Sequence, residues 1–250
     1  MAPSSSSTAP PPGFPPSVKY LTTPLPSRLL PFSSRATYCT SCPPHLLPNP
    51  PPRVSIKPIS DPLHPANGQS GLFNTSGKKF ERGTWIRDYV GVVHTEEEAD
   101  GKSDYDLSLE RRVVKGEKEG EEDRVEVTGI DATKAGNEAR FVNDYRGVPT
   151  FVRPNALFEL RHFTVSSPNP SKPPQECVRM SIWAGPHGVE KGSEICVSYG
   201  SGFWSERRKE WAEEEERQKK DGEKGMKEEA EKGKMEKQGK GGKGKKAKKG

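Results

Sequence analysis

The sequence predicts a mostly β (α+β) domain of short strands in small sheets, with a disordered tail at each end. Short apolar alternations bounded by Gly, Asn and Pro fill residues 67–204, as expected for short strands. Residues 1–66 are rich in Pro and Ser, and residues 205–250 are charged throughout. The hydrophobic share is 30% against about 45–50% in a typical globular domain, so we expect only the middle region to bury a core.

Residues 1–66 are predicted to form a disordered or polyproline-like arm. Runs such as PPPGFPP and PNPPPR remove backbone donors and disfavour helix in their neighbours. The arm has no Asp or Glu before Asp61 and carries scattered basic residues, a composition also typical of an organelle-targeting transit peptide. The many prolines disfavour the amphipathic helix of such a peptide, so a solvated tail is the favoured interpretation and a targeting role the alternative.

The region 67–204 is expected to hold short strands and little helix. The strands are predicted from short apolar alternations, and Gly, Asn and Pro bound these alternations in the region. The expected strands are Gly71–Phe73, Thr84–Val93, Tyr105–Leu109, Val125–Asp131, Ala156–Val165 and Val178–Ala184. The expected connections are a charged hairpin extension at Glu110–Arg124, a helical turn or two near Ala132–Asn137 and a Pro-rich loop at Ser166–Glu176.

Residues 205–250 are expected to begin as an exposed helix and to end as a disordered Lys- and Gly-rich tail. Acids precede bases at helical spacing in 211–220, and glycines recur after Gly222 and lower helix propensity. The run Lys237–Gly250 is typical of a nuclear-import or nucleic-acid patch, with a plain solvated tail as the alternative. Acidic blocks upstream partly offset it, so any nucleic-acid contact is expected to be weak and salt-sensitive.

Cysteine and histidine spacing indicates neither a disulfide framework nor a metal site. Cys39 and Cys42 form a lone Cys-x-x-Cys without the second ligand pair of a zinc knuckle. Cys177 and Cys196 are expected in or beside strands as small apolar residues, and a reducing compartment is the simpler interpretation. The five histidines lack metal-ligand spacing, and neither a Ser-His-Asp set nor a phosphate loop is evident. No run of about 18 apolar residues predicts a membrane span.

Two segments far apart in the sequence indicate function most strongly. Gly136–Asn143 reads Gly-Asn-Glu-Ala-Arg-Phe-Val-Asn and is followed by Pro154-Asn155. Glu194–Tyr199 reads Glu-Ile-Cys-Val-Ser-Tyr. Together they resemble the paired signature of SET-domain protein lysine methyltransferases, which fold around a knot-like crossing of two such segments.

The resemblance extends in order over Gly68–Trp204, a little over half of the chain. Gly68–Phe73 is similar to the family's Gly-rich turn, and Tyr89-Val90-Gly91 to its Tyr-x-Gly. Asp104–Leu107 is similar to the strand whose Tyr lines the channel for the substrate lysine. Matches in this order are more specific than any one of them.

The resemblance implies S-adenosylmethionine as cofactor, a lysine of a protein as substrate, and no metal. It assigns Tyr199 to catalysis, with Tyr105 orienting the lysine. Asn143 is implied to bond the methionine portion, with backbone groups from the Gly-rich turn, since a turn without Cβ can approach a ligand closely. The full implied cofactor-binding set is Gln69, Ser70, Gly71, Arg140, Asn143, Asp144, Phe203 and Trp204.

The implied chemistry suits these residue types. Methyl transfer from a sulfonium to an amine is an in-line displacement, so the protein supplies mainly alignment and desolvation. The lysine must be neutral to attack. A narrow channel of Tyr rings and backbone carbonyls lowers the pKa of the lysine by desolvation, and the nearby sulfonium charge lowers it further.

Departures from the family pattern bear on activity. Asp144 stands where the family has His and is expected to find another partner in Arg146, while Ser198 replaces the usual Asp before Tyr199. The Cys-rich zinc segments that flank many members are missing. The alternative is therefore a non-catalytic SET-like module that binds a protein partner. For an enzyme, histone tails are the default substrate and non-histone proteins the alternative, with a nuclear location expected and a cytoplasmic one as the alternative.

Overall fold

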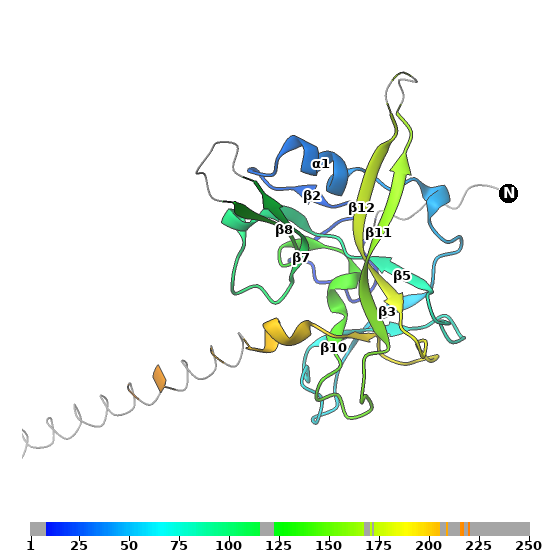
Figure 1. Ribbon diagram of the computed structural model, residues 1–250. Helices are drawn as coiled ribbons and strands as arrows, with labels where there is room; N and C mark the ends of the chain where they lie inside the picture. The colour runs from blue at the N-terminus through cyan, green and yellow to red at the C-terminus, as the bar shows by residue number, and fades with distance from the viewer. Residues whose placement is uncertain are drawn as a thin grey trace, which may run out of the picture. The chain divides into compact units, whose positions relative to one another are not determined.

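A computed structural model describes residues 9–115, 123–167, 171, 173–205, 209, 216, 217 and 220. The chain divides into two compact units, Met1–Ser198 and Tyr199–Gly250. The first unit is mostly β and built from small sheets, as predicted (Figure 1). Its described helices are α1 (Phe32–Cys39) and the short 3-10 helices η1 (Pro44–Leu46), η2 (Glu96–Glu98) and η3 (Glu138–Phe141).

The two larger sheets hold most of the strand residues. The four-stranded sheet has the order β2 (Leu25–Pro26), β6 (Val92–Thr95), β8 (Arg124–Asp131), β7 (Asp106–Val114). The three-stranded sheet has the order β11 (Ala156–Val165), β12 (Gln175–Ala184), β5 (Trp85–Asp88). In both, the long strands pair antiparallel as hairpins, which is why their alternating patterns were visible in the sequence.

Three two-stranded sheets complete the first unit. They are β1 (Lys19–Tyr20) with β9 (Ala135–Gly136), β3 (Val54–Pro58) with β4 (Ser70–Asn74), and β10 (Asn143–Asp144) with β13 (Cys196–Val197). The β1–β9 and β10–β13 pairs are parallel, and β3–β4 is antiparallel. A parallel pair needs a long connection, so these two pairs join segments far apart in sequence.

The predicted strands are confirmed in place, with two differences. The expected strand Thr84–Val93 is split into β5 and β6 around Gly91, where a Cβ would lie 2.4 Å from the Asp131 carbonyl oxygen. The helical turn expected at Ala132–Asn137 is wrong: that stretch contains β9, and the helical turn follows it as η3. The charged hairpin extension is formed partly by β7 and β8, and residues 116–122 at its centre lie outside the described residues.

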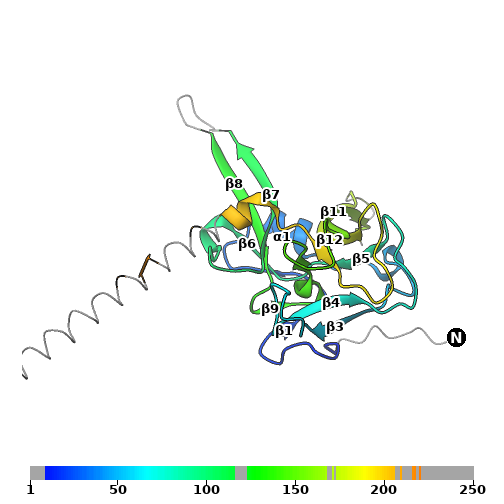
Figure 2. The ribbon, with the colours of Figure 1, turned by 90° about the horizontal axis from the view of Figure 1, so that it is seen from below.

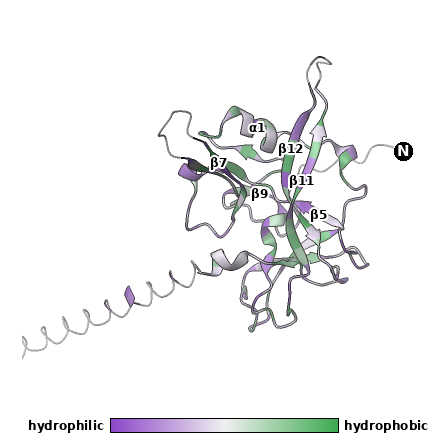
Figure 3. Ribbon diagram, in the orientation of Figure 1, coloured by the Kyte–Doolittle hydropathy of each residue, from purple (hydrophilic) through white to green (hydrophobic). Residues whose placement is uncertain are grey.

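The core of the first unit is apolar and lies between the sheets. Its most buried large side chains come from strands and their flanks: Leu30, Leu72, Ile86, Ile130, Ile182 and Ile195. Hydrophobic and hydrophilic segments follow one another along β11 and β12, as expected for half-buried strands (Figure 3). Cys177 and Cys196 are buried in β12 and β13, as predicted, and the four cysteines, all of them described, are free thiols.

The expectation of a disordered arm over 1–66 is wrong from residue 9 onward. This N-terminal segment (9–66) adds β1, β2 and β3 to three different sheets, and Figure 2 shows β1 and β3 beside β9 and β4. Its buried side chains include Leu21, Leu30 and Tyr38, which are 7%, 2% and 6% exposed. Proline is tolerated at strand edges, so a Pro-rich segment can still pair along one side.

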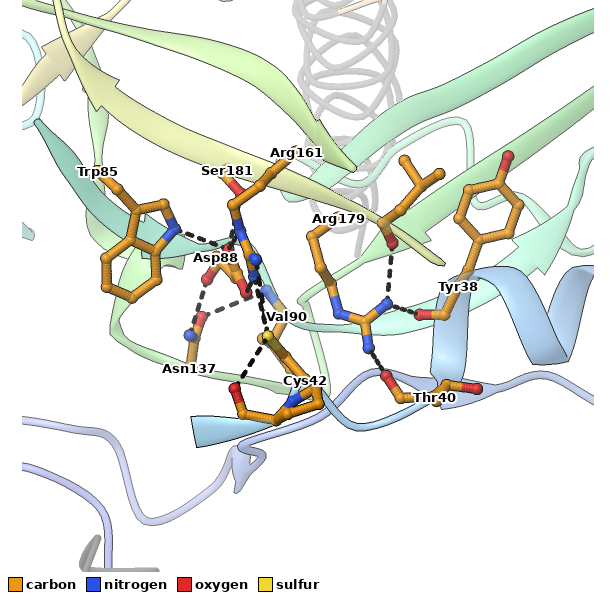
Figure 4. A network of polar contacts seen from close by, with 12 residues as sticks. Tyr38, Thr40, Cys42, Trp85, Asp88, Val90, Asn137, Arg161, Arg179 and Ser181 are labelled. Carbon is orange, nitrogen blue, oxygen red and sulfur yellow. Dashed lines mark hydrogen bonds and ion pairs between the residues drawn. The ribbon is translucent and has the colours of Figure 1, made fainter. Parts of the chain in front are cut away.

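A buried arginine of β12 anchors the N-terminal segment. Arg179 is 3% exposed, and its guanidinium donates to the carbonyl oxygens of Tyr38 and Thr40, at the end of α1 (Figure 4). Burial lowers the pKa of Arg179 from its usual value, while Asp88 acts in the opposite direction. Helix C-terminal carbonyls have no intrahelical partner, so this cation satisfies groups that α1 leaves unpaired.

The described part of the second unit is short. Residues 200–205 are helical. The predictions for 206–208, 210–215, 218–219 and 221–250, including the Lys237–Gly250 run, lie outside the described residues. Within the described part of the chain, no helix has both the length and the apolar character needed to span a membrane.

Candidate functional site

The two motif segments singled out in the sequence lie side by side. Asn143 and Asp144 of β10 pair in parallel with Cys196 and Val197 of β13. Asn155 locks the pair, because its side chain donates to the Glu194 carbonyl oxygen at 2.7 Å and accepts from the Cys196 amide at 2.8 Å. The fold therefore brings together all three predicted pieces: Gly136–Asn143, Pro154-Asn155 and the start of Glu194–Tyr199.

A buried carboxylate stands at the centre of this meeting point. Glu194 is 7% exposed; its Oε1 accepts from the Asn143 amide at 2.8 Å, and its Oε2 lies 3.0 Å from the His64 Nε2. Gly71 of the Gly-rich turn faces the same carboxylate, and a Cβ there would lie 2.5 Å from Glu194 Oε1. The close approach that requires a glycine is thus made by the protein's own Glu194.

These contacts fix the orientation of the Asn143 side chain. Its Nδ2 lies 2.8 Å from Glu194 Oε1 and 3.4 Å from the Ser70 carbonyl oxygen. Both neighbours are acceptors, so the amide nitrogen and not the oxygen must face them. The carbonyl oxygen Oδ1 of Asn143 consequently does not face either of these two acceptors.

The predicted lysine-orienting residue, Tyr105, is held from two sides. The Arg140 guanidinium carbon lies 3.9 Å from the centroid of the Tyr105 ring, and Arg140 Nε donates to the Ala132 carbonyl oxygen at 2.9 Å. The Tyr105 carbonyl oxygen accepts from the Tyr89 hydroxyl at 2.8 Å. Arg140 is 9% exposed, so its observed role is to hold the Tyr105 ring by a cation–π contact.

Arg146 bonds both residues that depart from the family pattern, Asp144 and Ser198. Asp144 is buried and accepts from Arg146 twice, at 2.8 Å from the backbone amide and at 2.8 Å from the guanidinium. The same Arg146 nitrogen donates to the Ser198 hydroxyl at 3.2 Å. The prediction that Asp144 finds Arg146 as its partner is therefore confirmed, and Ser198 shares that partner.

In the Gly-rich turn, some backbone groups of Gln69 and Ser70 already make hydrogen bonds within the protein. The Gln69 amide donates to the Ala66 carbonyl oxygen at 3.0 Å, and its carbonyl oxygen accepts from the Ile59 amide at 2.8 Å. Ser70 begins β4, opposite Pro58. The amide of Gln69 is thus committed to the turn itself, and a cofactor contact there would fall to the second lone pair of its carbonyl oxygen.

The remaining predicted site residues lie in the second unit. Tyr199 and Phe203 pack edge to face with ring centroids 5.0 Å apart, and Phe203 and Trp204 do so at 5.4 Å. Such edge-to-face pairs are the favoured aromatic geometry. The three predicted aromatics therefore form one continuous series of rings within that unit.

A polar network around Asp88 contacts the first motif segment, Gly136–Asn143, through Asn137 (Figure 4). The Asp88 carboxylate accepts from Arg161 at 2.5 Å, Trp85 at 2.8 Å and Ser181 at 2.7 Å. The Asp88 carbonyl oxygen accepts from the Asn137 amide at 2.9 Å, and Asn137 caps η3 by accepting from the Ala139 amide. Asp88 thus links the three-stranded sheet to the helical turn that carries Arg140.

The N-terminal segment also reaches the motif directly. The Tyr20 hydroxyl donates to the Glu138 carboxylate at 3.0 Å, and Arg87 Nε donates to the other oxygen at 2.5 Å. Burial raises the pKa of Tyr20, and the Glu138 charge adds to the increase. A chain that begins at residue 67 would lack Tyr20, so the buried Glu138 carboxylate would lose that hydrogen-bond donor.

Sequence reasoning missed His64, a site residue from the N-terminal segment. It is 7% exposed and lies 130 positions before its partner Glu194. No local pattern marks a histidine in a Pro-rich stretch as buried, so only the tertiary contact identifies it. Comparison of the sequence with models of protein families and with curated proteins finds no match, so the resemblance to SET-domain methyltransferases depends on the motifs themselves.

Proposed function

We propose that the protein is an S-adenosylmethionine-dependent protein lysine methyltransferase with a SET-like core and a knot-like crossing of its two motif segments. One observation carries the proposal: β10 pairs with β13, so that Asn143 of one motif contacts Glu194 of the other. Asn143 and Glu194 are 51 positions apart in the sequence, and chance matches have no reason to meet in space. Histone tails are the default substrate and non-histone proteins the alternative.

The groups at this meeting point suit the methionine portion of the cofactor. Its ammonium group needs hydrogen-bond acceptors, and the orientation of the Asn143 amide leaves Oδ1 as one. Gly71 keeps the turn free of side-chain bulk beside that amide, since a Cβ there would lie 3.2 Å from Asn143 Nδ2. Asn143 and the backbone of Ser70 and Asp144 would hold the cofactor.

The chemistry asks little of the protein beyond alignment. When bound, S-adenosylmethionine supplies a methyl group already activated by its sulfonium. By the resemblance Tyr199 is the catalytic residue. Tyr105 would orient the lysine amine, and the cation–π contact from Arg140 keeps the Tyr105 ring in one position. A desolvated channel lowers the pKa of the lysine, so that the neutral amine is present to attack.

Calorimetry of the full chain with S-adenosylmethionine tests the proposal first. Binding is expected, and a folded chain without measurable binding would reject the enzyme and favour the non-catalytic interaction module. The Asp144–Arg146–Ser198 network is the observation that favours this second candidate, because it fills positions where the family has other residues.

Transfer of labelled methyl to a protein array tests the catalytic role of Tyr199. Tyr199→Phe is expected to bind the cofactor but to lose about a hundredfold in transfer, because the hydroxyl that orients the amine is gone. Tyr145→Phe is the matched control, since the Tyr145 hydroxyl makes no hydrogen bond among the described residues. Equal activity of both variants would remove Tyr199 from the mechanism.

A further inference from the structure

His64 lies in a well-bonded loop of the N-terminal segment that covers the candidate site. The loop is closed by hydrogen bonds from the His64 amide to the Asp61 carbonyl oxygen at 3.1 Å and from the Asn67 amide to the His64 carbonyl oxygen at 2.9 Å. Pro65 packs against Gly147, where a Cβ would lie 2.8 Å from the Pro65 ring. His64 is therefore held in place by its own loop and by the segment that follows Asp144.

The neighbours of the imidazole identify its protonation state. His64 Nδ1 accepts from the backbone amide of Ala66 at 3.0 Å, so Nδ1 carries no proton. Nε2 lies 3.0 Å from the Glu194 carboxylate, which only accepts. Both contacts are satisfied together by the neutral ring with its proton on Nε2. A proton on Nδ1 would set two donors against each other.

The Glu194 carboxylate is held by His64 and in turn orients the Asn143 side chain. One carboxylate oxygen is occupied by His64 and the other by Asn143 Nδ2. Gly71 lies beside the same carboxylate, since an added methyl group there would lie 3.0 Å from the Glu194 Cδ. With both oxygens bonded, the carboxylate is held in one orientation, and the Asn143 amide cannot turn its oxygen toward Glu194 without setting two acceptors against each other.

We propose that His64 is a positioning residue of the cofactor site. As the neutral Nε2–H tautomer it fixes Glu194, and Glu194 orients Asn143 so that its Oδ1 is presented to the ammonium group of S-adenosylmethionine. The inference rests on the proposed function for the identity of the ligand. The constraint on Glu194 and Asn143 belongs to the protein alone and is measurable without a ligand.

Two substitutions of His64 separate its two nitrogens. His64→Gln places an amide nitrogen near the position of Nε2 and keeps a donor for Glu194. His64→Asn places an oxygen near the position of Nδ1, so it keeps the acceptor for Ala66 and loses the donor for Glu194. His162→Asn is the matched control, because His162 is exposed on β11 and far from these contacts in its pairing register.

The first measurement is calorimetry of the full-length variants with S-adenosylmethionine. His64→Asn is expected to weaken binding about tenfold, which is the usual scale of a lost hydrogen bond to a charged group. His64→Gln is expected to recover most of that loss, and His162→Asn to bind as the wild type does. Equal affinities for His64→Asn and the wild type, in a protein that melts cooperatively, would overturn the proposal.

The second measurement needs no ligand. Nitrogen-15 NMR of the wild-type imidazole is expected to show the Nε2–H tautomer for His64, and the Asn143 side-chain amide is expected to exchange slowly with solvent. Fast amide exchange, or the Nδ1–H tautomer, would overturn the positioning role even if His64→Asn does not fold. If the wild type shows these signals but binds no S-adenosylmethionine, the proposed function and this use of His64 fail, while the constraint on Asn143 stands.

Discussion

Two histidine–carboxylate pairs with the same nitrogen–oxygen distance have different roles in this protein. His94 Nε2 lies 3.0 Å from Asp106 in the four-stranded sheet, and His64 Nε2 lies 3.0 Å from Glu194 in the candidate site. They differ at the other ring nitrogen. His94 Nδ1 lies 2.9 Å from the Thr95 carbonyl oxygen, an acceptor, whereas His64 Nδ1 faces the Ala66 amide, a donor.

The second contact decides the charge of each ring. With acceptors on both sides, His94 satisfies both only as the imidazolium, and the Asp106 hydrogen bond raises the pKa of His94 from its usual 6.5, with Thr95 adding to the increase against the effect of burial. His64 satisfies its contacts as a neutral ring. The His94 ring thus donates to both of its neighbours, whereas the His64 ring donates to Glu194 and accepts from Ala66.

Replacing each carboxylate by its amide should give the largest difference between the two pairs. Glu194→Gln sets an amide against two donors, His64 and Asn143, so one buried donor loses its acceptor at a cost of about 2–3 kcal/mol in the free energy of unfolding. Asp106→Asn sets an amide oxygen against a single donor and is expected to cost about 1 kcal/mol or less. Urea denaturation of both variants measures the difference.

The opposite ranking in that experiment would contradict the assignment of roles. Asp106→Asn would be the costlier change if the sheet pair carried the buried, fully bonded carboxylate. The exposures argue against this, because the Glu194 side chain is 7% exposed and that of Asp106 is 20% exposed.

Adding a side chain at Gly71, beside the His64–Glu194 pair, should have the next largest effect on stability. Gly71→Ala places a methyl group 2.5 Å from Glu194 Oε1, and the carboxylate is pinned by His64 and Asn143, so overpacking is expected to cost about 2 kcal/mol. Gly101→Ala is the control, because a Cβ there meets nothing within 4 Å. Thermal melting of the two variants checks the prediction, and equal melting temperatures would show that Glu194 can move aside.

Changing the pH should have the smallest effect on stability. It should act through the His94–Asp106 pair of the four-stranded sheet. Since the folded-state pKa of His94 is raised, its stabilisation is fully present below its unfolded pKa and is lost as pH rises through the folded value. The difference in free energy of unfolding between wild type and His94→Gln should therefore be largest below about pH 6.5 and shrink as the pH rises above it. A difference that grew with pH would reverse the sign assigned to His94.

Sequence reasoning identified the parts of the fold with local patterns. The expected strand Ala156–Val165 is β11, because it and its antiparallel partner β12 are apolar runs divided by a Pro-rich loop. The resemblance implied that Asn143 and Gly71 share one site, and the structure places them close together. The Asp144–Arg146 contact joins residues two positions apart. These features were accessible because each depends on residues close in sequence or on a known order of motifs.

The parts that escaped prediction depend on distant contacts. Leu21, Leu30 and Tyr38 are buried, yet they are scattered among prolines without helical or strand period. The strands β1 and β2 pair over only two residues each, which leaves no alternation to detect. His64 acquires its role from Glu194, 130 positions away.

The placement of β1, β2 and β3 bears on how this protein can be produced. A chain cut at residue 67, where composition suggests that order begins, would uncover the edges of β9, β6 and β4 at once. Unpaired strand edges recruit strands from other molecules, so such a fragment should aggregate during expression. The N-terminal segment thus covers three sheet edges, and keeping it in the expressed chain is expected to prevent this aggregation.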